Sequence, residues 1–205
     1  MTTRSLPLPA PFQVTAACKI EGRVVRLLDA QGFGRFDFRS HSVEELELDF
    51  EGITANRHRG HTRKADARVP YLKRGAQMRN SRHLSLVSAE DCTELARRLD
   101  LNLFDPAWLG ANLVVASVPH FSYVPRGTKI LCGGGAVLNI EDQNAPCSRA
   151  AEAIAQANPG RGDIKLTFPK IAKGLRGIVA TVEYPALLRI GALLTLRLPE
   201  QWIYG

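Results

Sequence analysis

The feature that most constrains this fold is a series of short stretches that are rich in β-branched residues. Residues typical of turns separate these stretches. Eight such stretches predict strands, at residues 19–28, 43–50, 83–87, 112–116, 129–132, 136–141, 178–184 and 193–198. Glycine and proline punctuate them, as at 125–127 and at the three consecutive glycines 133–135. Many short strands with this punctuation are typical of a mainly β protein, either a barrel or a sandwich.

Two segments with helical periodicity interrupt the strands. The first begins after Ser88, which suits an N-cap, and Asp91 stands three residues later as in a capping box. Its apolar positions, Ala89, Cys92, Leu95, Ala96 and Leu99, share one face, so Cys92 is predicted to be buried. The second helix is expected over about 146–157, because proline is well tolerated in a first helical turn.

The length of 205 residues suits one domain with a full core. We expect a single domain over residues 15–205, preceded by a proline-rich extended arm over residues 1–14. No apolar run approaches the ~20 residues that span a bilayer, and the first residues lack the apolar core of a secretory signal. These features predict a cytoplasmic protein without a membrane segment, and none of them specifies an oligomeric state.

The positive charge is concentrated in one segment. Residues 56–83 hold nine basic residues against the single acid Asp66, a charge of +8, whereas the whole chain carries +7. The rest of the chain is therefore close to neutral, at −1. The basic residues are Arg57, Arg59, Arg63, Lys64, Arg68, Lys73, Arg74, Arg79 and Arg82. This concentration predicts a local site for an anionic partner; the alternative is a solvated basic loop.

Four cysteines are present, and none of them forms a C-x-x-C pair that would indicate a zinc ribbon. In a reducing compartment we expect free thiols. Cys147 differs from the others because it follows a predicted strand and falls in the first turn of the second predicted helix. Free amide groups and the helix dipole favour a thiolate there, as a nucleophile or a soft metal ligand. The alternative is a small, buried residue at a helix start.

The histidines of the basic segment are better suited to an anion than to a metal. His58 and His61 have a spacing that a metal site could use, but the surrounding arginines would repel a divalent cation. Arginine and protonated histidine together suit phosphate. The glycines at 133–135 precede a strand and not a helix, so they predict a turn and not a phosphate loop.

Several separated segments, in this order, are similar to one known family. They are residues 52–60, 79–88, 109–115 and 136–140, then Asn144-Ala145-Pro146-Cys147, then 175–182 and 189–191. Together they resemble the MOSC domain, named after the C-terminal domain of molybdenum cofactor sulfurases, over about residues 15–200. One departure is Ala55-Asn56, where the family usually has Gly-Asp before its basic residues.

The resemblance implies a β-barrel like that of pyruvate kinase, with two or three peripheral helices, that binds a molybdenum–pyranopterin cofactor. It also implies that Cys147 is the catalytic residue and the molybdenum ligand, or a sulfur carrier. For the rest of the pocket we expect amides at Asn80, Asn112 and Asn144 for the pterin ring. Its phosphate would be bound by Arg57, His58, Arg82 or His83.

The implied activity is reduction of N-hydroxylated small molecules. An electron-donor protein would be required, because no flavin or iron–sulfur motif is present. A second hypothesis is a carrier of the cofactor or of sulfur, without catalysis of its own. A third is a nucleic-acid-binding barrel; against it, Tyr71 is the only aromatic residue of the basic segment, so bases would find few stacking partners.

Overall fold

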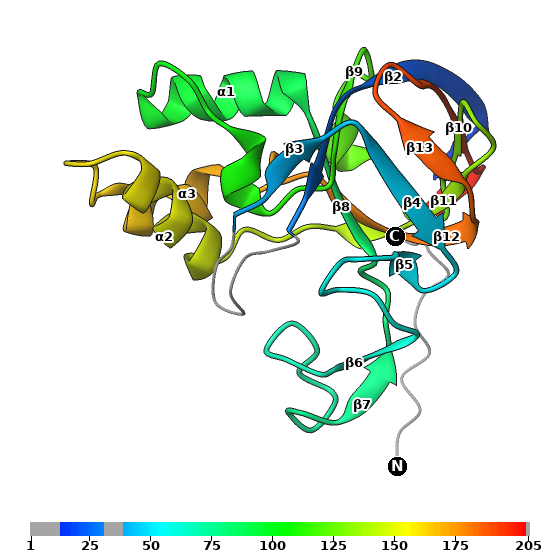
Figure 1. The fold of residues 1–205 in the computed structure, drawn as a ribbon, viewed down its shortest axis with the longest axis horizontal. Coiled ribbons are helices and arrows are strands. Elements are labelled where there is room, and N and C mark those ends of the chain that lie inside the picture. Colours follow the sequence, from blue (N-terminus) through cyan, green and yellow to red (C-terminus); the bar gives the residue numbers. More distant parts are fainter. Residues whose placement is uncertain (1–12, 31–38, 204–205) are drawn as a thin grey trace.

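A computed structural model describes residues 13–30 and 39–203, and its centre is a closed seven-stranded β-barrel (Figure 1). The strands follow the order β14-β10-β11-β12-β8-β9-β2, and β14 pairs with β2 to close the barrel. Their bounds are Cys18–Asp29 (β2), Leu84–Ser88 (β8), Leu113–Ala116 (β9), Lys129–Cys132 (β10), Val137–Gln143 (β11), Ile178–Tyr184 (β12) and Leu193–Leu198 (β14). All neighbours are antiparallel except β8 and β9, which run parallel. The prediction of a barrel is confirmed.

Apolar side chains that alternate along these strands fill the barrel. Leu86, Leu113 and Leu196 are fully buried, as are Leu138 and Ile140 of β11. Inward residues alternate with outward ones because successive side chains of a strand point to opposite faces. This is the pattern that predicted seven of the strands, and the bounds agree to within two residues.

The shorter strands lie around the barrel. β1 (Gln13–Thr15) pairs with β15 (Gln201–Ile203), and β3 (His41–Val43) extends the sheet from β2. β4 (Glu45–Asp49) pairs on one side with β13 (Leu187–Arg189) and on the other with β5 (Gly52–Ile53). The strand expected over 43–50 corresponds to β4, which begins two residues later because the chain bends at Glu44. Of the expected arm, residues 1–12 lie outside the described residues.

Helices gather on one side of the barrel (Figure 1). They are α1 (Ala89–Leu99), α2 (Ser148–Ala157) and α3 (Ile164–Ile171), with 3₁₀ turns at Pro106–Leu109 and Phe121–Tyr123. Ser88 caps α1 as predicted, since its side chain accepts a hydrogen bond from the Asp91 amide. Sequence reasoning missed α3, which contains Pro169 in its interior. Within the described part of the chain, no helix is long and apolar enough to cross a bilayer.

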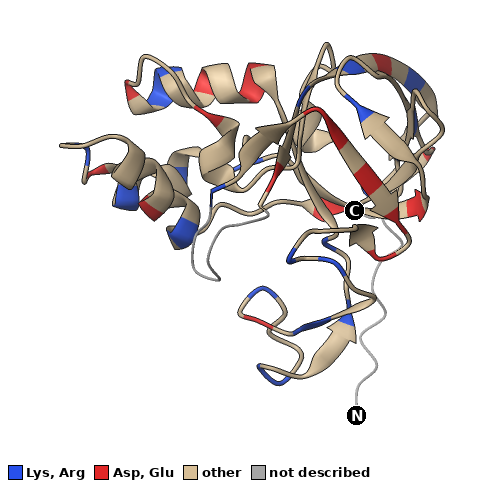
Figure 2. Cartoon of the chain, viewed as in Figure 1, with Lys and Arg blue, Asp and Glu red and all other residues tan. Residues whose placement is uncertain are grey.

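The basic segment contains a small hairpin that projects away from the barrel. Its strands are β6 (Thr62–Lys64) and β7 (Gln77–Arg79), and they pair only with each other. Figure 2 shows basic residues along this hairpin and on the chain that leads to it. We call residues 62–79 the basic hairpin. Its strands are three residues long, too short to show a period, which explains why the sequence predicted only an irregular segment here.

Candidate functional site

Cys147 occupies the N-cap of α2, which begins at Ser148, two residues later than expected. Its backbone is extended, with φ −137° and ψ 160°, and its carbonyl accepts the first helical hydrogen bond, from the Ala151 amide at 3.1 Å. The side chain is half-buried against the apolar cluster under the helices. The position still lies at the amide end of the helix, where partial positive charge favours an anion. Cys147 is thus neither sealed in the core nor fully exposed.

Two arginines lie close enough to Cys147 for their charges to interact with its sulfur. Hydrogen bonds to Asp66 chiefly raise the pKa of Arg68, and a thiolate at Cys147 raises it further. Burial lowers the pKa of Arg176 to about 10, and a thiolate at Cys147 acts against this lowering. A negative sulfur would therefore be favourable to both guanidinium groups, one from the basic hairpin and one from the loop before β12.

Arg176 is a buried arginine without a carboxylate partner among the described residues. It is 3% exposed, its Nη2 donates to the Leu109 carbonyl at 2.7 Å, and its Nε is buried without a hydrogen bond. The next residue, Gly177, has φ +82°, and a Cβ there would lie 1.9 Å from the Leu86 carbonyl oxygen. This close approach of the loop to β8 fixes Arg176 under the site. Since buried charges are costly unless compensated, Arg176 favours a negative group nearby.

Arg82 adds a third guanidinium to the cluster. Its Nη2 donates to Asn144 Oδ1 at 2.5 Å, and the side chain is half-buried. Burial is the main cause that lowers its pKa to about 10, and the charges of three further arginines, Arg68, Arg176 and Arg63, add to the lowering. Arginines that depress one another's pKa in a partly desolvated place are a feature of anion-binding sites.

Asp66 is the acidic residue within this arginine cluster, and its carboxylate is already engaged. It accepts from Arg68 Nε at 2.9 Å and Nη2 at 2.5 Å, and from Arg63 at 3.3 Å. The hydrogen bonds from Arg68 hold the pKa of Asp66 far below its usual range, so it stays ionised. One carboxylate against Arg63, Arg68, Arg82 and Arg176 leaves the cluster strongly positive.

His58 borders the same cluster as a neutral imidazole. Its pKa is lowered to about 4, first by desolvation and then by the charges of Arg57, Arg82 and Arg68, although the residue keeps contact with solvent. The neighbouring Asn56 is buried, accepts from the His58 amide at 2.9 Å and donates to Asp29 at 2.6 Å. The amide that replaces the family's usual acid thus shapes the turn that carries Arg57 and His58.

Two residues predicted for the pocket, Asn112 and Asn144, contact Ser85, and a third, Arg82, contacts Asn144. Asn112 Oδ1 accepts from the Ser85 amide at 2.9 Å, and Asn144 Nδ2 donates to Ser85 Oγ at 3.0 Å. The side chain of Asn144 also accepts a hydrogen bond from Arg82, and its backbone amide donates to the Gly177 carbonyl at 2.9 Å. The basic segment, the start of β9 and the turn before Cys147 therefore lie on one side of the domain.

Asn80 and His83 are placed differently from that expectation. Asn80 is buried and fully hydrogen-bonded, since its amide group donates to two carbonyls, of His58 and Gly60, and its oxygen accepts from the Arg82 amide. His83 is 5% exposed, and its Nδ1 accepts from the Val182 amide at 3.3 Å. The contacts of Asn80 give it a structural task, whereas Nε2 of His83 is buried without a hydrogen bond to any described residue. The ligand set proposed below leaves both residues out.

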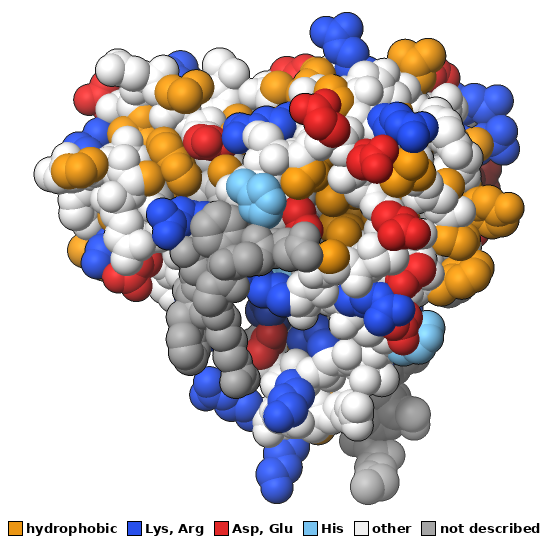
Figure 3. Space-filling view, viewed as in Figure 1, with side chains coloured by type: hydrophobic (Ala, Val, Ile, Leu, Met, Phe, Trp, Pro, Cys, Tyr) orange, Lys and Arg blue, Asp and Glu red, His pale blue; other side chains and the backbone are white. Residues whose placement is uncertain are grey.

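The surface over this region is strongly basic. Figure 3 shows Lys and Arg side chains over the basic hairpin and in the hollow between the hairpin and the rest of the domain. Sequence reasoning found Arg57, Arg82 and Cys147, but it missed Arg176, which lies outside the basic window. The signal for Arg176 was the glycine that follows it, because a close backbone approach often requires glycine.

Comparisons with known proteins agree with this architecture. The model of the family described as the MOSC domain matches residues 73–195. YuaD of Bacillus subtilis (strain 168), whose name refers to metal–sulfur cluster biosynthesis, is 36% identical over 154 residues, covering 75% of this chain and 80% of YuaD.

Solved structures show the same fold. The crystal structure of the Bacillus subtilis YuaD protein superposes with a TM-score of 0.84 and 31% identity, over 88% of this chain and 98% of that one. YiiM from Geobacillus stearothermophilus, at 13% identity, shares the fold with a TM-score of 0.57 over 89% of this chain and 75% of its own. From the match of the family model and the identity to YuaD, we conclude that this chain belongs to the MOSC domain family.

Proposed function

We propose that this protein binds a molybdenum–pyranopterin cofactor, with Cys147 as the metal ligand, and reduces N-hydroxylated small molecules. The observation that carries the proposal is the position of Arg68 and Arg176 near one half-buried thiol, with Arg82 close to both arginines. Guanidinium forks suit phosphate oxygens, and a thiolate suits a soft metal. Few ligands combine both chemistries, and a phosphate-bearing pterin that carries a metal is one of them.

The donor set fits a metal that brings its own organic ligand. Within residues 13–30 and 39–203, no three His, Cys, Asp or Glu side chains are grouped so as to hold an ion. The protein would therefore give one sulfur, from Cys147, and the rest of the coordination would come from the cofactor. The buried, uncompensated charge of Arg176 supports a negative group beside it.

The remaining roles follow from the contacts of the protein's own residues. Arg82, held by Asn144, would bind the cofactor's phosphate together with Arg57. His58, neutral at pH 7, would donate or accept a hydrogen bond without adding to the repulsion among the arginines. Asn112, which contacts Ser85, would border the pterin ring. When bound, the cofactor would supply the redox chemistry, and an electron-donor protein would supply the electrons.

A second candidate function is transport of sulfur or of the cofactor without reduction. The name of YuaD, which refers to metal–sulfur cluster biosynthesis, favours this candidate. A half-buried cysteine at a helix start, flanked by arginines, is suited to carrying a negatively charged sulfur adduct as well. Mass spectrometry of the purified protein would detect such an adduct on Cys147.

One experiment tests the main proposal directly. The wild type and Cys147→Ser are purified from a host that makes the cofactor, and both are analysed for molybdenum and for pterin fluorescence. We expect metal and pterin in the wild type and loss of at least the metal in the variant. Wild-type protein without either component would contradict the proposal. Salt-sensitive binding of random DNA would instead favour the nucleic-acid hypothesis.

A further inference from the structure

A buried carboxylate, Glu141, lies on the strand that leads to Cys147. The pairing of β11 with β12 shifts between Ile140 and Asp142, so Glu141 is the extra residue of a β-bulge. It is 3% exposed, although the inward-facing Ile140 directly precedes it. Bulges redirect a side chain out of the regular alternation, and they are frequent next to functional sites.

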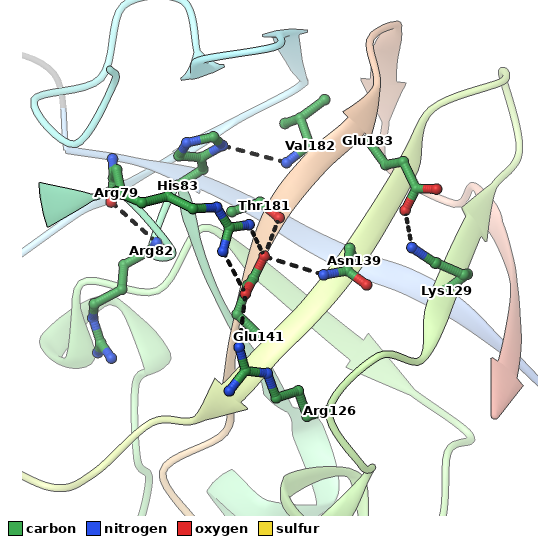
Figure 4. Close-up of polar contacts among 11 residues, drawn as sticks. Arg79, Arg82, His83, Arg126, Lys129, Asn139, Glu141, Thr181, Val182 and Glu183 are labelled. Carbon is green, nitrogen blue, oxygen red and sulfur yellow. Dashed lines mark hydrogen bonds and ion pairs between the residues drawn. The ribbon is translucent and has the colours of Figure 1, made fainter. Parts of the chain in front are cut away.

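Four side chains surround this carboxylate (Figure 4). Thr181 and Asn139 donate to Oε1, at 2.8 and 3.1 Å, and both belong to the barrel. Arg126 lies 3.9 Å from Oε2. Arg79 binds both oxygens, with Nη1 3.1 Å from Oε2 and Nη2 in close contact with Oε1. Burial alone would raise the pKa of Glu141, but the hydrogen bonds outweigh it and keep the carboxylate ionised.

Arg79 differs from the other three because it belongs to the basic hairpin. It is the last residue of β7 and pairs with Thr62, the first residue of β6. Three residues later, Arg82 binds Asn144, which is three residues after Glu141. Two arginines at the root of the hairpin therefore reach two points on the segment that ends at Cys147. The strands of the hairpin pair with no other strand, so these contacts contribute to its orientation.

We propose that the Arg79–Glu141 pair is a positioning device that holds the basic hairpin so that Arg68 lies close to Cys147. The bidentate fork fixes direction as well as distance, which a single contact would not do. Both residues act through the hairpin and not through contact with the ligand. Because this role presupposes the proposed anion site, its test needs a readout of the charge around Cys147 that works without any cofactor.

The reaction of Cys147 with two alkylating reagents provides this readout. Iodoacetate is an anion, whereas iodoacetamide is neutral, and both react with the same thiolate. The iodoacetate ratio is the rate of reaction with iodoacetate divided by the rate with iodoacetamide, measured at Cys147 and compared with the same ratio for free N-acetylcysteine. It reports the local positive potential, and the fraction of thiolate cancels because it enters both rates. Peptide mapping assigns the label to Cys147. The full chain is used, and thermal melting shows that each variant is folded.

Three variants separate positioning from long-range charge. Arg79→Met breaks the pair, and Arg126→Met removes the same charge near the same carboxylate but leaves the hairpin attached. Glu141→Gln breaks the pair while it makes the protein more positive by one charge. Long-range electrostatics alone would raise the iodoacetate ratio in Glu141→Gln, whereas loss of positioning would lower it, so the sign of the change decides.

We expect a raised ratio in the wild type and in Arg126→Met. In Arg79→Met and Glu141→Gln we expect it to fall by at least about threefold, because displaced guanidinium groups interact more weakly with the reagent. An elevated wild-type ratio that both variants retain, or a rise in Glu141→Gln, would overturn the positioning role and leave the anion site standing. A wild-type ratio equal to that of N-acetylcysteine would overturn the anion site itself, and with it the role of the pair.

Discussion

The barrel and the basic hairpin are held in place by different forces. The barrel encloses Leu86, Leu113 and other fully buried apolar residues, and its strands pair all the way round. The basic hairpin has exposed residues such as Tyr71 and Leu72, and it is joined to the barrel by polar contacts of Arg79 and its neighbours. Packing thus stabilises the fold, whereas directed polar contacts place the charges of the site.

This difference implies that substitutions in the two regions should affect different measurements. Changes in the barrel should lower the free energy of unfolding, because they remove buried apolar contacts. Changes in the hairpin should alter ligand binding and Cys147 chemistry while the fold persists.

The largest expected difference concerns the thiols. Burial raises the pKa of Cys92 and of Cys132 to about 12, from 9.0, which lowers their thiolate fraction by about a thousandfold. In the folded protein iodoacetamide should therefore modify Cys147 long before either of them. We expect Cys147 to exceed exposed Cys18 as well, because the guanidinium groups of Arg68 and Arg176 lie close to its sulfur. Peptide mapping at limiting reagent measures this order, and faster labelling of any other cysteine would contradict it.

The next effect compares two leucines. Leu86 is 0% exposed within the barrel, so Leu86→Ala should lower the free energy of unfolding by about 3 kcal/mol. Leu72 in the hairpin is 36% exposed, and Leu72→Ala should change the free energy of unfolding by less than about 0.5 kcal/mol. Urea unfolding measures both variants. Equal losses would mean that the hairpin is packed as an integral part of the core.

Arg82→Met should weaken ligand binding and have little effect on the free energy of unfolding, the reverse of Leu86→Ala. We expect about a tenfold weaker affinity for inorganic phosphate, because a charge-assisted hydrogen bond is removed from the proposed site. Arg57→Met should act in the same direction. Arg97→Met, on the exposed end of α1, is the matched control for loss of one charge. Calorimetric titration with phosphate measures the affinity. If Arg82→Met unfolds while phosphate binding stays unchanged in Arg57→Met, these arginines are structural.

Because His58 is exposed and solvent screens the charges around it, the pH dependence that it causes is the smallest expected effect. Its pKa is about 4 in the folded protein and near 6.5 when unfolded, so between these values the unfolded chain binds more protons. Stability from this group is complete above pH 6.5 and falls as the pH drops towards 4. His58→Gln should therefore lose less stability than the wild type over this range, as measured by urea unfolding at a series of pH values. Identical pH profiles would show that His58 titrates normally.

The barrel was largely predictable from sequence because its signals are local. Alternation and turn residues located β10, β12 and β14 with correct bounds, and Ser88 with Asp91 located the start of α1. The pairing order and the closure of β14 on β2 depend on contacts between distant residues, which alternation does not encode. The resemblance to the MOSC domain supplied the barrel topology.

The site was predictable only in part, for a similar reason. The Asn144–Cys147 motif and the local excess of arginines are visible in sequence, so Arg82 and Cys147 could be predicted as site residues from sequence alone. Arg176 and Glu141 were not, because their roles arise from burial and from a bulge that brings them to partners far along the chain. Asn80 and His83 were chosen by residue type, which does not show whether a side chain binds a ligand or supports its neighbours, so their role as ligands stays a prediction.

The closure of the barrel has a consequence for folding on the ribosome. The first half of β2 pairs with β14, from Arg23 with Leu193 to Cys18 with Leu198. Every residue assigned to the site precedes β14, so all of them emerge before the barrel can close. Until then the first half of β2 lacks its partner β14, and contacts between such distant segments form slowly. The site is therefore completed by a strand that contributes no side chain to it.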